Sequence, residues 1–169
     1  MNTTHLHLLL NHFPIIGTLI GTGLLLWAII KNQDNIKLLS SVLLILMALI
    51  AIPVYLTGEP AEESVEKLAG VSETMIELHE DAASIAMWLM GIAALFAFAA
   101  IIIQHRKVKL AKQLFIGTFI FSAICFVAMA RTGYYGGQIR HTEIRSDASA
   151  SQQNENETQK KGEMEKDDD

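Results

Sequence analysis

Residues 13–30 of the chain read FPIIGTLIGTGLLLWAII and contain no Asp, Glu, Lys or Arg. Three further stretches are equally free of these charges: residues 38–56, 82–103 and 113–130. A helix of roughly 20 apolar residues is long enough to cross the hydrocarbon layer of a membrane. Because core helices of soluble proteins rarely stay uncharged over such lengths, the sequence predicts an all-α integral membrane protein with four spans.

The connections 31–37 and 104–112 are short, which favours a four-helix bundle with up-down topology. In such a bundle the first and third spans lie diagonally across the core. No basic residue precedes the first span and no small-residue cleavage site follows it, so we expect this span to remain in the mature protein. The single cysteine, Cys125, lies in the fourth span and is expected to be a small core residue.

The charges of the connections predict an orientation. Connection 31–37 carries two lysines and one acid, and connection 104–112 carries Arg106, Lys107, Lys109 and Lys112 with no acid. Lys and Arg are enriched in cytoplasmic loops, so both connections are expected to face the cytoplasm. The termini and the loop 57–81, with eight acids against Lys67, would then face the outer side of the membrane.

The last 24 residues form a separate segment in composition. Residues 146–169 contain eight acids and three lysines, a net charge of −5, while residues 1–145 contain ten charges of each sign. The formal charge of −5 for the whole chain therefore comes from this segment alone. It has no aromatic residue and no apolar periodicity, so we expect a disordered acidic tail after a transmembrane domain at 1–145.

Five of the six histidines collect at the predicted outer end of the bundle. They are His5, His7, His12, His79 and His141, whereas His105 lies in a cytoplasmic connection. A histidine at a membrane interface is commonly a simple amphipathic anchor, and this interpretation is preferred for His5 and His7. His12 opens the first span and His79 precedes the third, so the bundle would place these two at the same depth on facing helices.

The surroundings of His79 support a special role for it. The segment SETMIELHED, residues 72–81, has the spacing of an amphipathic helix that leads into the third span, within an outer amphipathic segment at about 60–81. Glu73 and Glu77 would face water, while His79 would face the bundle. Ala82, Ala83 and Ala86 follow on the same side, and these small side chains would leave space beside the ring.

The start of the first span has two further features. Pro14 would kink the helix beside His12 if the helix already begins at Thr3 or Thr4. Gly17 and Gly21 form a G-x-x-x-G pair, which is typical of close packing between membrane helices.

Four segments carry a resemblance: HLLLNHFPIIGTLIG (7–21), VYLTGEPAEE (54–63), GVSETMIELHEDAA (70–83) and RTGYYGGQIRHTEI (131–144). Together they resemble an uncharacterised family of small four-helix bacterial membrane proteins, whose first helix opens with a His-Phe-Pro motif. The resemblance covers residues 5–145 and implies the fold, but it implies no reaction. The motif positions that could carry chemistry are His12, Glu59, Glu62, His79, Glu80, Arg131, Arg140 and His141.

The architecture also resembles, more loosely, the four-helix b-type cytochromes, which hold haem between histidines on facing helices. Members with two haems need a second histidine pair near the cytoplasmic side, where this chain has only His105. The resemblance therefore implies at most one haem b near the outer face. His12 and His79 would be its axial ligands, Arg131 or Arg140 would meet its propionates, and electron transfer beside a respiratory complex would be its role.

Two alternatives stay open. His12, His79 and His141 with Glu59 or Glu80 have the ligand types of a transition-metal site, although their order along the chain has no characteristic spacing. The chain could also be an accessory membrane subunit in which outer histidines and acids join the loops by hydrogen bonds. The spans contain no ionisable carboxylate or base, which argues against a proton-coupled transporter. No motif of a hydrolase and no basic outer surface for nucleic acid is present, and enzymatic activity stays undecided.

Overall fold

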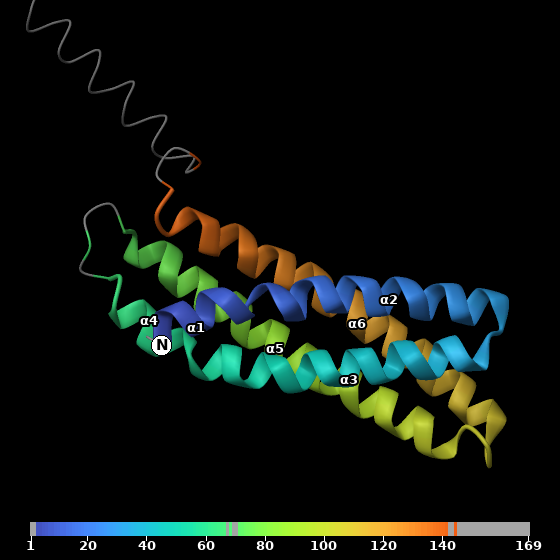
Figure 1. The fold of residues 1–169 in the computed structure, drawn as a ribbon. Coiled ribbons are helices and arrows are strands. Elements are labelled where there is room, and N and C mark those ends of the chain that lie inside the picture. Colours follow the sequence, from blue (N-terminus) through green and yellow to red (C-terminus); the bar gives the residue numbers. More distant parts are fainter. Residues whose placement is uncertain (1–2, 67, 69–70, 142–143, 145–169) are drawn as a thin grey trace, which may run out of the picture.

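The computed structural model describes residues 3–66, 68, 71–141 and 144, and these residues form an all-α membrane bundle. The predicted tail at 146–169 lies outside the described residues. The helices are α1 (Thr3–Leu10), α2 (His12–Lys31), α3 (Asp34–Leu56), α4 (Gly58–Glu63), α5 (Glu73–Ile103) and α6 (Val108–Gln138). The four long helices run up and down as predicted (Figure 1).

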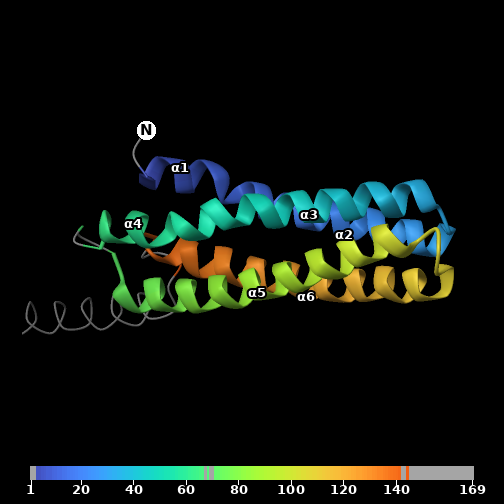
Figure 2. The same ribbon diagram turned by 90° about the horizontal axis from the view of Figure 1, so that it is seen from below.

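The long helices form a square in cross-section. Helix α2 packs against α3 and α6, and α5 packs against the same two helices, so α2 and α5 are diagonal as expected. The α2–α3 and α5–α6 connections lie at one end of the bundle, called here the basic end (Figure 2). Helices α1 and α4, the start of α5 and the end of α6 lie at the other, the acidic end.

Four helices are long and apolar enough to cross a membrane, and only 28% to 33% of the residues in their most apolar windows are buried inside the bundle. Large side chains such as Leu19, Leu95 and Phe98 are exposed on the outer faces of the bundle. Lipid tails solvate such side chains as well as a protein core does, so helix association depends on close packing instead. The fold is therefore that of a multi-pass membrane protein whose outer surface contacts the bilayer.

The inward face of each long helix is marked by small or hydroxyl-bearing residues at alternating intervals of four and three. In α6 the buried positions are Ala111, Phe115, Thr118, Ser122, Cys125 and Met129. In α2 they include Pro14, Thr18, Gly21, Leu25 and Ala28. A 3.5-residue repeat is the pattern of left-handed, coiled-coil-like packing. Cys125 is buried as expected, and its thiol donates to the carbonyl of Ala86 at 3.4 Å.

Glycines permit the closest contacts between helices. A Cβ atom at Gly17 would overlap Sδ of Met47, and one at Gly21 would lie 3.0 Å from Cγ of Leu44. Both partners are on α3, so the predicted close packing of the Gly17–Gly21 pair is confirmed. On the other side of the bundle, a Cβ atom at Gly117 would lie 2.5 Å from Cδ1 of Phe96.

The first helix begins at Thr3, well before the predicted start of the span, and it is interrupted at Asn11. Pro14 has no N–H to donate to the carbonyl of Leu10, which explains an interruption at this point. The helix is thus interrupted beside His12, and the kink itself stays a prediction. Helix α1 packs against α4 and α3, so that it contributes side chains to the acidic end.

Helix α5 is longer than its uncharged part. Its 31 residues give a length of about 46 Å, whereas the hydrocarbon layer is roughly 30 Å thick. The hydroxyl of Ser72 caps it by accepting the N–H of Met75 at 3.4 Å. The amphipathic turns around His79 therefore continue into the span as predicted, and they extend the bundle at the acidic end. Gly58 and Pro60 lie in the first turn of the short helix α4.

Candidate functional site

His79 is half-buried between α5 and α6. Its Nδ1 lies 2.8 Å from the carbonyl oxygen of Thr132, and a Cβ atom at Gly136 would lie 3.0 Å from the same nitrogen. The space that the small residues of α5 leave beside the ring is thus occupied by α6. A carbonyl only accepts, so Nδ1 carries a proton, and in the neutral imidazole Nε2 has a lone pair.

His7 has the same arrangement on another helix. It is half-buried on α1, with Nδ1 3.0 Å from the carbonyl oxygen of Val54 and 3.4 Å from the hydroxyl of Thr57. Its Nε2 therefore also keeps a lone pair. The charges of His7 and His79 are close enough to influence one another. Two imidazoles from α1 and α5 thus lie within range of an electrostatic interaction. His7 was not among the site residues predicted from the sequence.

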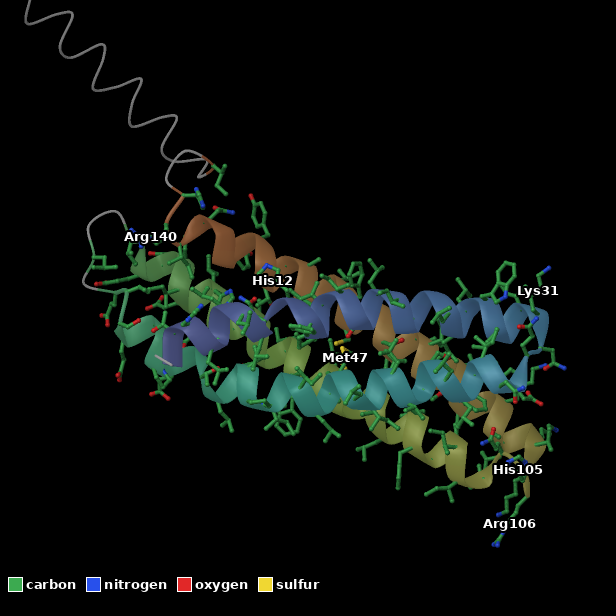
Figure 3. The ribbon with its side chains drawn as sticks, in the orientation of Figure 1. His12, Lys31, Met47, His105, Arg106 and Arg140 are labelled. Atoms are coloured by element: carbon green, nitrogen blue, oxygen red, sulfur yellow. The ribbon has the colours of Figure 1, made fainter. Side chains whose placement is uncertain are left out.

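The other four histidines are all exposed. His12 is exposed on α2 and makes no hydrogen bond within the described part of the chain (Figure 3). His5 and His141 are exposed at the acidic end, and His105 is exposed at the basic end. The structure therefore places His79, but not His12, in the interior of the helix packing.

The two predicted arginines are on or just after α6. Arg131 is exposed and donates from Nε and Nη2 to the hydroxyl of Tyr135, at 3.1 and 3.0 Å. Its guanidinium also lies 5.3 Å from the centre of the Tyr135 ring. Arg140 is exposed at the acidic end (Figure 3). Both cations are at the same end as His79, and Arg131 is oriented by its own helix.

The predicted metal ligands are distributed over this end. His12, His141, Glu59 and Glu80 are all exposed, and only His79 is half-buried. Among residues 3–66, 68, 71–141 and 144, no three His, Cys, Asp or Glu side chains are grouped closely enough to hold a metal ion. The metal site stays a prediction from the residue types.

Two carboxyl groups meet between α4 and α5. Burial, followed by a hydrogen bond with Glu80, raises the pKa of Glu62 to about 7, and the charges of Glu80, Glu66 and Glu59 add to this effect. Such a hydrogen bond needs a proton on one of the two carboxyl groups. The pair therefore joins α4 to α5 most strongly when one proton is shared.

Hydroxyl groups make further connections at the acidic end. Oγ1 of Thr4 lies 2.7 Å from Oγ of Ser64, which joins α1 to the turn after α4. The hydroxyl of Tyr55 lies 2.9 Å from Oγ of Ser84, which joins α3 to α5. The acidic end is therefore a polar cap that holds the histidine pair between several helices.

The Glu62–Glu80 pair predicts a pH-dependent stability. The folded protein holds a proton with a pKa of about 7, whereas the ordinary pKa of Glu62 is 4.5, so this stabilisation is complete below pH 4.5 and is lost as the pH rises through about 7. Because Glu62 is only partly buried, we expect a loss of about 1 kcal/mol after solvent screening.

Thermal unfolding in detergent at pH 5 and pH 8 measures this loss. Glu62→Gln should make the melting temperature less dependent on pH, since an amide does not titrate. Glu77→Gln, an exposed control on α5, should keep the wild-type dependence. Identical pH profiles for the wild type and Glu62→Gln would contradict the shared proton.

Comparison with known proteins does not assign the chain to a family. No protein-family model matches the chain, and no curated protein or solved structure matches it.

Proposed function

We propose that the protein is a membrane electron carrier that binds one haem b at its acidic end, with His79 as an axial ligand. The supporting observation is the hydrogen bond from Nδ1 of His79 to the carbonyl of Thr132. Histidines that bind metals typically donate their other ring nitrogen to a carbonyl or carboxylate, which fixes the ring and directs the lone pair of Nε2 to the metal.

His7 is the second axial ligand that the geometry favours. It is half-buried, it lies within electrostatic range of His79, and its Nδ1 is likewise directed to a main-chain carbonyl. Two neutral imidazoles are a suitable donor set for low-spin haem iron, because the porphyrin supplies the other four ligands. His12 is the alternative ligand suggested by the sequence, and its exposed position requires the haem to lie farther from the core.

The remaining parts of the site would hold and tune the group. Arg140 and Arg131 carry the charges that suit haem propionates, and both lie at this end. A bound haem would supply a one-electron redox couple, while the polar cap would set its exposure to water. Electron transfer to or from a respiratory complex in a bacterial inner membrane is the role proposed for this carrier.

Haem content tests the cofactor directly. Full-length protein purified from cells grown with excess haem precursor should contain one extractable haem b per chain. Two haems per chain would contradict the single site, and none would contradict haem binding.

We also propose that both termini face the periplasm. The basic end has six Lys and Arg residues (Lys31, Lys37, Arg106, Lys107, Lys109 and Lys112) against one acid, Asp34, and such ends are retained in the cytoplasm. A reporter that works only in the periplasm should therefore be active when it is fused after Arg145. A silent periplasmic reporter together with an active cytoplasmic reporter at this position would reverse the orientation.

An accessory structural subunit is the second candidate. It is favoured by the hydrogen bonds that already join the helices at the acidic end, including those of His7 and His79 themselves. In this case the purified protein would be colourless, and His79→Ala would lower the melting temperature without any change in bound haem.

A further inference from the structure

A second candidate site lies at the basic end, at the opposite end of the bundle from His7 and His79. It is a cavity of about 270 Å³ between the end of α2, the start of α3 and the start of α6. Its lining residues are Ile29, Ile30, Asn32, Lys37, Lys112 and Phe115. Figure 3 shows Lys31 and Arg106 at this same end of the bundle. The volume is just below the roughly 300 Å³ at which pockets for drug-sized molecules begin, so the cavity suits a small polar group.

Lys37 provides a buried cation in this cavity. Only 7% of the residue is exposed, and its ammonium donates to Oδ1 of Asn32 at 2.8 Å and to Oδ1 of Asp34 at 2.9 Å. These bonds use two of its three N–H groups, and they fix the position of the charge. Asn32 ends α2 in a left-handed conformation with φ of 51°, which turns its amide toward Lys37. The amide nitrogen of Asn32 remains as a further donor.

Lys112 provides a second cation from another helix. It is exposed near the start of α6 and lines the same cavity. Asp34 neutralises part of the charge of Lys37, but it is the only acid at an end with six basic residues, a difference of +5. Two lysines and one asparagine thus line the cavity within a positively charged surface, and their side-chain nitrogen atoms are suitable donors for an anion.

The remaining wall is apolar and borders the lipid. Phe115 is buried, Ile29 is partly buried, and Ile30 is exposed on the outer face of α2. The cavity therefore has both polar donors and apolar side chains in its lining, and Ile30 is exposed beside it at one end of the membrane-spanning helices. A free inorganic anion would contact only the polar donors, whereas a phospholipid would contact these donors with its phosphate and the apolar side chains with its acyl chain.

We propose that this cavity binds the phosphate of an anionic phospholipid, with Lys37 and Lys112 as the cations and Ile30 against the acyl chain. Basic pockets between membrane helices are suited to such headgroups. The proposal does not depend on haem binding, because it concerns the opposite end of the bundle.

Native mass spectrometry of the full-length protein in detergent tests the site. Dioleoylphosphatidylglycerol should bind at one site per chain, and dioleoylphosphatidylcholine should bind much more weakly. Lys112→Gln should weaken binding of the anionic lipid about fivefold, the factor for one lysine near an anionic headgroup. Lys109→Gln is the matched control, because Lys109 is exposed on the same helix and does not line the cavity. It should leave the affinity unchanged.

Three outcomes would overturn the proposal. Equal binding of both lipids would show that the negative charge of the headgroup does not contribute to binding. An equal loss in Lys109→Gln and Lys112→Gln would show general attraction to the basic surface in place of a site. Inorganic phosphate that competes as strongly as the anionic lipid would show a site for free anions.

Discussion

Gly17→Leu is expected to destabilise the bundle by about 2 to 3 kcal/mol, the upper part of the range for an overpacked core. Any side chain at Gly17 meets the thioether of Met47, and Met47 cannot move aside easily. It is buried in a cluster with Met90, Cys125 and Met129, where a shift would displace further neighbours. The melting temperature in detergent should fall by several degrees, since about 1 kcal/mol corresponds to roughly 2–4 °C for a chain of this size.

Gly23→Leu is the matched control in the same helix. A Cβ atom at Gly23 would meet nothing within 4 Å, and the residue is exposed on the outer surface of α2. A leucine there would contact lipid and should leave the melting temperature unchanged or slightly raised. Equal melting temperatures for the two variants would contradict the close packing of α2 against α3.

The second large effect concerns the histidines. His79→Ala should remove bound haem completely, because it deletes the proposed ligand, whose ring is oriented by the hydrogen bond to Thr132. His7→Ala should have the same effect or leave a five-coordinate, high-spin iron, whereas His12→Ala should change little. His105→Ala is the control at the basic end and should bind haem as the wild type does.

The absorption spectra of these four variants separate the two ligand assignments. Loss of the low-spin spectrum in His12→Ala with retention in His7→Ala would favour the pair expected from the sequence. A full spectrum in His79→Ala would contradict both assignments.

The number of spans could be predicted from the sequence because charged residues are costly within the bilayer. Four uncharged stretches were sufficient to predict the all-α bundle. The structure has the helices α2, α3, α5 and α6 at those places. The orientation of each helix about its own axis was harder to predict. Lipid and protein interior are equally apolar, so the hydrophobicity of a residue does not show which way it faces.

The face of each helix that points into the bundle is instead indicated by the size and spacing of its residues. The buried positions of α2 run from Ala28 through Leu25, Gly21 and Thr18 to Pro14, at alternating steps of three and four. The same steps continued toward the N-terminus reach residue 11 and then His7. His12 is one position away from this stripe. The spacing of the small and buried residues therefore predicts that His7 faces inward, although its place near the membrane interface favoured the interpretation as an anchor.

The position of His79 was predictable, but its partners were not. His79 lies three residues after Ile76 and three before Ala82, both buried, so the inward stripe of α5 includes it. Its hydrogen bond to Thr132 joins residues 53 positions apart and depends on how closely α6 approaches. The meeting of Glu62 with Glu80 depends in the same way on the path of the chain around α4.

The central claim is that two half-buried imidazoles at the acidic end bind haem iron. The reduced-minus-oxidised absorption spectrum of the purified wild-type protein tests it most directly. Dithionite reduction should produce the sharp bands of a low-spin haem with two histidine ligands. A protein that stays colourless after expression with excess haem, and that contains no metal by elemental analysis, would contradict the claim.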